Sequence, residues 1–266
     1  MERQAFIAEG GRKYNGPGNN HSAHLAEWFA TPQGRYVLDW ELAQFANAVE
    51  DVFGYRAVQA SLPGIDFLHG NRIAFRVVAS LEPGGGLTAD PQQLPIASSS
   101  VDLVVLPHVL ETSADPHLVL REAERVLIPE GQIVISGFNT LSIWRLRQAL
   151  MRERRRRAAG APWDGRFIGL LRLKDWLHLL GFELNGGRFG CYAPPFATAQ
   201  WLQRCQFMEK AGARWWPITG GVYVVRAVKR VHGMRLVAPA WRKERARRRA
   251  LAPIPQRNGS ARQRHE

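Results

Sequence analysis

Apolar and polar positions between residues 87 and 138 follow the pattern of short strands joined by one helix. Residues 101–106 form an apolar run, as expected of a strand buried on both faces. Asp115 and Pro116 supply an N-cap and a first-turn proline for an amphipathic helix that reaches about residue 127. Residues 132–136 form the next strand. This order predicts half of a doubly wound α/β sheet, a fold that binds ligands at the carboxyl ends of its strands.

The same reasoning assigns elements to the rest of the chain. Apolar residues recur at helical spacing up to residue 53, and Gly54 supplies a stop signal. The glycine- and asparagine-rich residues 1–24 are expected to be a disordered lead-in. The predicted helices cover residues 32–53, 116–127, 141–157, 174–180 and 199–211, and the predicted strands cover 56–61, 74–80, 87–89, 101–106, 132–136, 182–185 and 221–228.

Composition indicates one globular domain. The chain has 266 residues, 45% of them hydrophobic, which predicts a single core over residues 25–238 and a basic, disordered tail over 239–266. Cys191 and Cys205 do not have the spacing of metal ligands or of a disulfide framework, so no metal site is expected. The N-terminus lacks the apolar core of a signal peptide, and no apolar run is long enough to span a bilayer, which predicts a cytoplasmic protein.

The net charge of +13 belongs mostly to two segments. Residues 242–266 hold nine Arg or Lys and two Glu, a net of +7, and residues 152–157 hold five Arg and one Glu, a net of +4. The presumed core is therefore close to neutral. Runs of this kind are either solvated or in contact with a nucleic acid or an anionic surface, and both interpretations stay open for 152–157 and 242–249.

Motifs spread over fifty residues resemble those of class I S-adenosylmethionine-dependent methyltransferases. They comprise Asp90, Leu94-Pro95, Ser100-Val101-Asp102, His108, Arg121-Glu122 and Arg125-Val126-Leu127, and they end at Gly131. The chain is similar to an uncharacterised proteobacterial branch of methyltransferase type 11-like proteins with a degenerate glycine loop. The resemblance implies a Rossmann-like, doubly wound, mostly parallel sheet of seven strands.

The resemblance also implies a site for S-adenosyl-L-methionine. Asp90 matches the position whose carboxylate accepts a hydrogen bond from the adenine amine, and a turn-capping role is the alternative. Pro107 and His108 match the segment that lines the methyl-transfer site, where His108 is the candidate general base or a structural histidine. The remaining matches to cofactor-binding positions are Ala60, Leu62, Gly64, Ser80 and Pro91. Asp102, Glu122 and Arg125 match positions that hold strand and helix together.

The first half of the domain departs from the family pattern D-x-G-x-G-x-G. Val58 stands at the acid, Ala60 and Leu62 stand at the first two glycines, and the second strand ends in Ala79-Ser80 without the usual acid. Each lost hydrogen bond to a charged group removes about 1.5–3 kcal/mol of the free energy of cofactor binding. Two functions therefore follow. One is a methyltransferase acting on an unidentified acceptor, with a small molecule favoured over a nucleic acid. The other is an inactive methyltransferase-like scaffold that binds nucleic acid or protein through its Arg-rich segments.

Overall fold

The computed structural model describes residues 19–145, 167–194, 204–205 and 207–231. Its strands are β1 (Arg56–Ala60), β2 (Phe75–Ser80), β3 (Leu87–Thr88), β4 (Val101–Pro107), β5 (Leu127–Phe138), β6 (Phe182–Gly190) and β7 (Val222–Lys229). Its helices are α1 (Asn19–Phe29), α2 (Pro32–Val49), α3 (Val109–Thr112), α4 (Pro116–Val126), α6 (Leu170–Leu179), α8 (Phe207–Trp215) and the 3-10 helix η1 (Pro217–Thr219).

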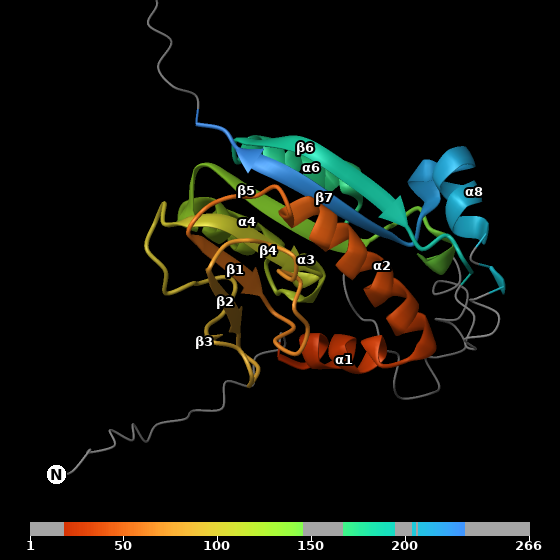
Figure 1. The fold of residues 1–266 in the computed structure, drawn as a ribbon, viewed down its shortest axis with the longest axis horizontal. Helices are drawn as coiled ribbons and strands as arrows, with labels where there is room; N and C mark the ends of the chain where they lie inside the picture. The colour runs from red at the N-terminus through yellow and green to blue at the C-terminus, as the bar shows by residue number, and fades with distance from the viewer. Residues whose placement is uncertain (1–18, 146–166, 195–203, 206, 232–266) are drawn as a thin grey trace, which may run out of the picture. The chain divides into compact units, whose positions relative to one another are not determined.

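The seven strands form one sheet in the order β3-β2-β1-β4-β5-β7-β6 (Figure 1). Strands β1 to β5 pair with one another in parallel, whereas β7 runs antiparallel to both β5 and β6. The predicted mostly parallel, doubly wound sheet of seven strands is confirmed. The carboxyl ends of the parallel strands therefore meet at one edge, which is where ligands bind in such folds.

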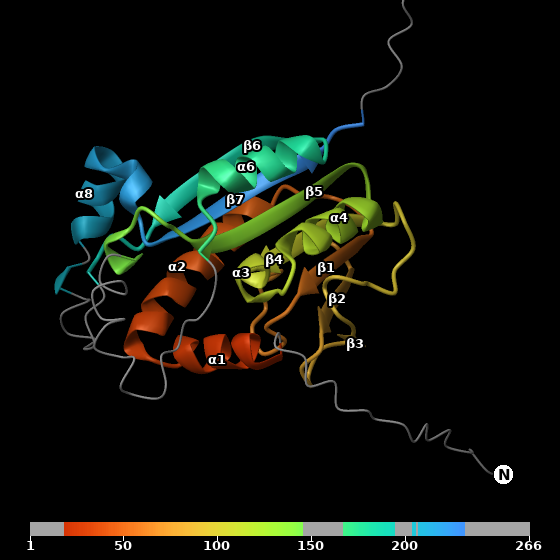
Figure 2. The same ribbon diagram turned by 180° about the vertical axis from the view of Figure 1, so that it is seen from behind.

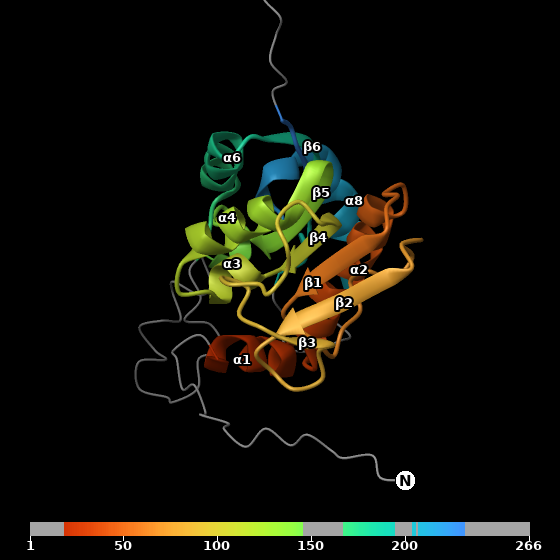
Figure 3. The same cartoon turned by 90° about the vertical axis from the view of Figure 1, so that its left-hand side faces the viewer.

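Helices cover both faces of the sheet. Helices α1 and α2 lie on the face seen in Figure 1, and α4 and α6 lie on the face seen in Figure 2. Figure 3 shows the sheet between these two layers. Residues of β4 serve the two cores alternately: Leu103 and Val105 belong to the cluster under α2, while Val104 and Leu106 belong to the cluster under α4. This two-sided burial explains the apolar run of this strand.

Several helix boundaries differ from the predictions, among them the start of α6, which is Leu170 rather than residue 174. Helix α1 begins at Asn19, so the predicted lead-in over residues 1–24 extends too far by six residues. Helix α2 ends at Val49 rather than at residue 53, because Asn71 Nδ2 donates to the carbonyl oxygens of Val49 and Val52, at 2.5 and 3.1 Å. A side chain distant in sequence thus satisfies the carbonyls that end this helix.

Two strands are longer than predicted because bulges interrupt their pairing without ending them. β5 begins at Leu127, and Glu130 takes a left-handed conformation with φ of 64° within it. β6 continues to Gly190, with a register shift between Leu184 and Gly186. Glycine and proline in these runs mark bulges rather than strand ends.

Several predictions fall on residues outside the described ranges. The helix predicted over 141–157 is described only to residue 145, and the tail 239–266 lies outside the described residues. Of the helix predicted over 199–211, residues 199–203 and 206 also lie outside them, and α8 (Phe207–Trp215) covers its second half. Within the described ranges, no helix combines the length and the apolar character needed to cross a bilayer.

Candidate functional site

The last residues of several strands bring the predicted cofactor-binding residues to one edge of the sheet. Ala60 ends β1, Ser80 ends β2 and Pro107 ends β4. Asp90 follows two residues after the end of β3, with Pro91 next to it. The parallel register fixes this arrangement, because Ala60 pairs with Ala79 and Val105 pairs with Gln59. Their predicted roles in cofactor binding remain predictions.

Four of the six described non-glycine residues with positive φ lie at the same edge. Ser61 and Leu62 after β1, His108 after β4 and Cys191 after β6 all have φ between 50° and 68°. Non-glycine residues rarely adopt this left-handed region, and it costs on the order of 1–3 kcal/mol. Such strain is typical of functional sites, where the surrounding structure holds it in place.

The loop after β1 is held from below by the buried side chain of Gln59. Its Nε2 atom donates to the carbonyl oxygens of Ser61, Leu62 and Ile65, at 3.2, 3.2 and 2.7 Å. Its Oε1 atom accepts from the amide of Phe67 at 2.9 Å. Gln59 thereby satisfies backbone groups that would otherwise be buried without partners.

Leu62 does not project from this loop. Its side chain is 1% exposed and belongs to the apolar cluster on the α2 face. No described atom lies within 4 Å of the position that a Cβ atom would occupy at Gly64. The backbone of the loop at Gly64 therefore has open space beside it.

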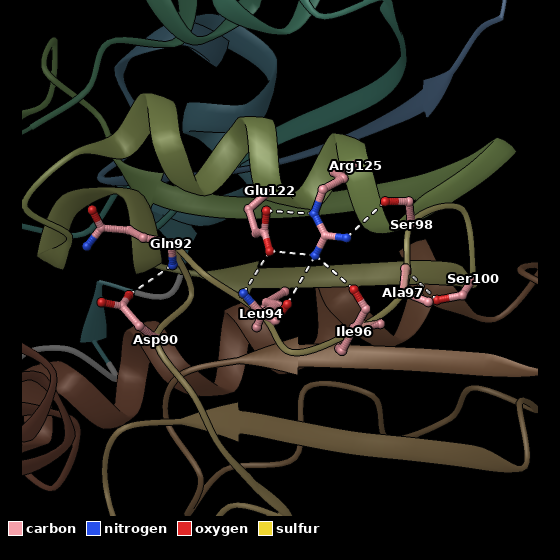
Figure 4. Close-up of polar contacts among 9 residues, drawn as sticks. All are labelled: Asp90, Gln92, Leu94, Ile96, Ala97, Ser98, Ser100, Glu122 and Arg125. Atoms are coloured by element: carbon pink, nitrogen blue, oxygen red, sulfur yellow. Dashed lines mark hydrogen bonds and ion pairs between the residues drawn. The ribbon is translucent and has the colours of Figure 1, made fainter.

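Asp90 and Ser80 cap local turns. Asp90 Oδ1 accepts from the amide of Gln92 at 2.9 Å (Figure 4), and Ser80 Oγ accepts from the amide of Glu82 at 3.0 Å. Asp90 is partly exposed, and a carboxylate has acceptor capacity beyond one hydrogen bond. The turn-capping role is therefore present, and it leaves room for a ligand contact.

The structural roles predicted for Asp102, Glu122 and Arg125 are confirmed. Asp102 Oδ2 accepts from the amides of Tyr55 and Arg56 at 2.8 and 2.9 Å, which ties the start of β1 to β4. Arg125 Nη2 donates to the carbonyl oxygens of Leu94 and Ile96 at 3.0 and 2.8 Å, and it also pairs with Glu122 (Figure 4). These contacts hold the loop that carries Asp90 against α4.

His108 lies between two buried carboxylates. Its Nε2 atom is 2.8 Å from Glu41 Oε1, and its Nδ1 atom is 2.7 Å from Glu111 Oε2. Glu111 Oε1 also accepts from the amide of Phe138 at 2.6 Å, and the ring of Phe138 lies 4.3 Å from the imidazole between centroids. In the described part of the molecule, Glu41 Oε2 is buried without a hydrogen-bond partner. The cluster links α2 to the segment after β4.

The two carboxylates determine the charge of His108. Burial lowers the pKa of the imidazole, but the charge of Glu41 and the hydrogen bonds to Glu111 and Glu41 outweigh it and raise this pKa to about 10. Burial raises the pKa of Glu111, and its hydrogen bond to His108 opposes that rise. The imidazole is therefore protonated at neutral pH, with both N–H groups directed at carboxylates.

The sequence contains a signal for a buried polar contact at Glu41. Val37, Glu41, Phe45 and Val49 recur every four residues, and all four are buried. A single acid on the apolar stripe of a helix requires a buried partner. That partner, His108, lies 67 positions away in the sequence, so its identity cannot be deduced from this spacing.

Comparisons with known proteins agree with this architecture. Residues 56–135 match the family model described as a methyltransferase domain. An uncharacterized Escherichia coli (strain K12) protein, YafS, is 47% identical over 102 residues, which are 38% of this chain and only 41% of that protein.

Two solved structures share the fold over most of the chain. A Thermotoga maritima S-adenosylmethionine-dependent methyltransferase, described as a possible histamine N-methyltransferase, covers 80% of this chain and 98% of its own, with a TM-score of 0.53 and 16% identity. An Archaeoglobus fulgidus S-adenosylmethionine-dependent methyltransferase covers 73% of this chain and 94% of its own, with a TM-score of 0.51 and 15% identity. At these identities the likeness establishes the fold.

Proposed function

We propose that this chain is a class I methyltransferase, which its fold and the match of residues 56–135 support, and that it transfers a methyl group from S-adenosylmethionine to an acceptor. The observation that supports the proposal most is the meeting of Ala60, Ser80 and Pro107 at the edge next to Asp90. The acceptor in this proposal is a small molecule.

The described residues fit the cofactor in part. Asp90 would accept the adenine amine, and Ser80 with Pro91 would lie near the ribose and base. The backbone from Ala60 to Gly64 would lie along the methionine part, since Leu62 is turned into the core and the space beside Gly64 is open. S-adenosylmethionine supplies an electrophilic methyl group on a positively charged sulfur. Positioning of the acceptor accounts for most of the rate in such a transfer.

His108 and Pro107 would lie near the transferred methyl group. Because the pKa of His108 is raised to about 10, the ring retains its proton at neutral pH. In this proposal His108 therefore orients the segment after β4 through Glu41 and Glu111 and is not the base, because its side chain is enclosed and both ring nitrogens contact carboxylates. The acceptor must lose its proton to water or be deprotonated before binding.

Titration with S-adenosylhomocysteine tests the proposal. The two family acids missing at the ends of the first and second strands remove roughly 3–6 kcal/mol of binding free energy. We therefore expect a dissociation constant near millimolar rather than micromolar. Asp90→Ala should weaken binding at least about tenfold, because one charge-assisted hydrogen bond is lost. Asp90→Asn is the matched control, since its amide oxygen still caps the amide of Gln92. If the folded wild type gives no heat of binding and no thermal shift at millimolar ligand, the cofactor proposal is wrong.

A second candidate function is binding of a nucleic acid or an anionic surface by the Arg-rich segments. It is favoured by the +11 charge that residues 152–157 and 242–266 carry together out of a total of +13. The experiment measures RNA and DNA binding at several salt concentrations with the whole chain and with a chain lacking 242–266. We expect salt-sensitive binding that this deletion removes. Equal binding by both proteins contradicts this role of the tail.

A further inference from the structure

Large apolar side chains are exposed on one surface formed by α8, η1 and the segment that follows β5. This surface, called here the α8 surface, comprises Leu141, Phe207, Trp215, Trp216 and Ile218, with exposed fractions between 57% and 71%. Asn139 joins its two parts, because its side chain donates to the carbonyl oxygen of Ile218 at 2.6 Å and accepts from the amide of Leu141 at 3.1 Å.

The orientation of α8 is fixed by contacts on its inner side. Gly212 is buried against Tyr192, and a Cβ atom added there would lie 2.3 Å from the Tyr192 ring. Glu209 also points inward, where it accepts hydrogen bonds from the Tyr36 hydroxyl and from the amides of Tyr192 and Cys191. The outward direction of Phe207 and Trp215 is therefore a property of the fold rather than of a loose helix.

The charge on the outer side of α8 is positive. Lys210 and Arg214 are exposed, and the only acid of the helix, Glu209, is engaged inside the molecule. Arg145, which follows Leu141 closely, is also exposed, with its guanidinium 4.9 Å from the centre of the Phe167 ring. The surface thus combines exposed aromatic and aliphatic groups with cations.

This combination matches the chemistry of an anionic bilayer surface. Tryptophan and phenylalanine enter the boundary between headgroups and acyl chains, while lysine and arginine contact lipid phosphates. A binding site for a single-stranded nucleic acid has aromatic rings spaced along a basic groove, so that successive bases stack on them. Here Trp215 and Trp216 instead contact each other, with ring centres 6.3 Å apart, and the surface also exposes the aliphatic Leu141 and Ile218.

We propose that the α8 surface docks this protein on anionic phospholipid membranes, with Trp215 and Trp216 inserted at the interface and Lys210 and Arg214 on the lipid phosphates. This role does not depend on methyl transfer. It differs from any contact made by the Arg-rich tail, because its residues belong to the folded domain.

Co-sedimentation of the full chain with vesicles tests the proposal. The vesicles contain phosphatidylglycerol and phosphatidylethanolamine, with pure phosphatidylcholine vesicles for comparison. We expect binding to the anionic vesicles, and a loss of at least about tenfold in Trp215→Ser/Trp216→Ser because the inserted apolar area is removed. Lys210→Gln/Arg214→Gln should weaken binding about fivefold per charge.

Tyr55→Ser/Phe75→Ser is the matched control. These aromatic residues are 85% and 61% exposed, but they lie at the amino ends of β1 and β2, the opposite edge of the sheet. This variant should bind vesicles like the wild type. Trp215→Phe/Trp216→Phe should also still bind, but with less quenching of its tryptophan fluorescence by brominated lipids.

Three results would overturn the proposal. Wild-type binding by both the serine and the glutamine variants would assign membrane contact to the Arg-rich segments. A large loss of thermal stability in the serine variant would show that the chain itself covers this surface. Binding of single-stranded RNA that depends on the two tryptophans, without vesicle binding, would assign the surface to a nucleic acid.

Discussion

His108 is a charged side chain enclosed between Glu41 and Glu111, away from water. Burying three ionisable groups is expensive, and their mutual attraction compensates only when geometry and hydrogen bonds are good. Both imidazole N–H groups and one oxygen of each carboxylate meet this condition at 2.7–2.8 Å. The cluster therefore fixes α2 against the end of β4 at the edge where the proposed site lies.

The stability of the protein should depend on the protonation of His108. Its folded-state pKa of about 10 lies above the unfolded value of about 6.5, so the imidazolium contributes stability that is complete below the unfolded value. This contribution is lost as pH rises through about 10. We expect the free energy of unfolding, measured by urea denaturation, to fall by on the order of a few kcal/mol between about pH 7 and pH 10.

Glu111→Gln should move that loss of stability to lower pH, because one of the two charges that raise the pKa of His108 is removed. Glu27→Gln is the matched control: Glu27 pairs with His24 on the surface, where both side chains are largely exposed. An unchanged pH profile in Glu111→Gln would argue against a charged His108.

The sequence indicated the roles of some residues better than others. Asp102, Glu122 and Arg125 were assigned correctly through a resemblance that covers their immediate surroundings. Gln59 and Glu41 were not, because each acts on atoms that only the tertiary structure brings within reach. An amide or acid inside an apolar pattern shows that a buried partner exists, but not which one.

At the scale of elements, the loop from residue 90 to residue 100 depends on α4 for its shape (Figure 4). Arg125 donates to two of its carbonyl oxygens and to Ser98 Oγ at 3.0 Å, and Glu122 Oε1 accepts from the amide of Leu94 at 2.8 Å. The position of Asp90 therefore depends on a helix that follows it in sequence.

Arg125→Met should destabilise the protein by about 1–3 kcal/mol, because the carbonyl oxygens of Leu94 and Ile96 lose their donor. Arg121→Met, on the exposed side of the same helix, should change stability by less than about 0.5 kcal/mol. Urea unfolding measures both, and hydrogen exchange of the Leu94 amide reports the loop directly. Equal stability of the two variants would contradict a role for Arg125 in holding the loop.

Element boundaries were predicted best where one signal decides them. The start of α4 follows from Asp115, whose side chain accepts from the amide of His117 at 2.9 Å, and from Pro116. The extents of β5 and β6 were underestimated, because glycines that end a strand and glycines that form a bulge look alike in sequence. Helix α1 was not predicted, because the glycine- and asparagine-rich residues 1–24 were assigned to a disordered lead-in, although the helix begins at Asn19.

At the scale of the whole molecule, the N-terminal helices cover a face that crossover connections usually cover. Within the described residues, the connections from β1 to β2 and from β2 to β3 contain no helix. Leu62, Phe67, Leu68 and Ile73 of the first connection instead pack with residues of α1 and α2 in one cluster. The resemblance predicted the sheet but not this replacement, since the sequence between Pro63 and Arg72 shows only that the connection is short.

The place of β7 between β5 and β6 has a consequence for biosynthesis. During translation, β5 is complete at Phe138, but its free edge receives a neighbour only when residues 222–229 have been made. At about 5–20 residues per second, that interval lasts roughly 5–20 s. β6 is also synthesised before β7, its neighbour in the sheet, and stays unpaired until β7 has been made. Each nascent chain therefore carries an open, apolar strand edge, on which polysome-bound neighbours can assemble incorrectly, until the last strand arrives.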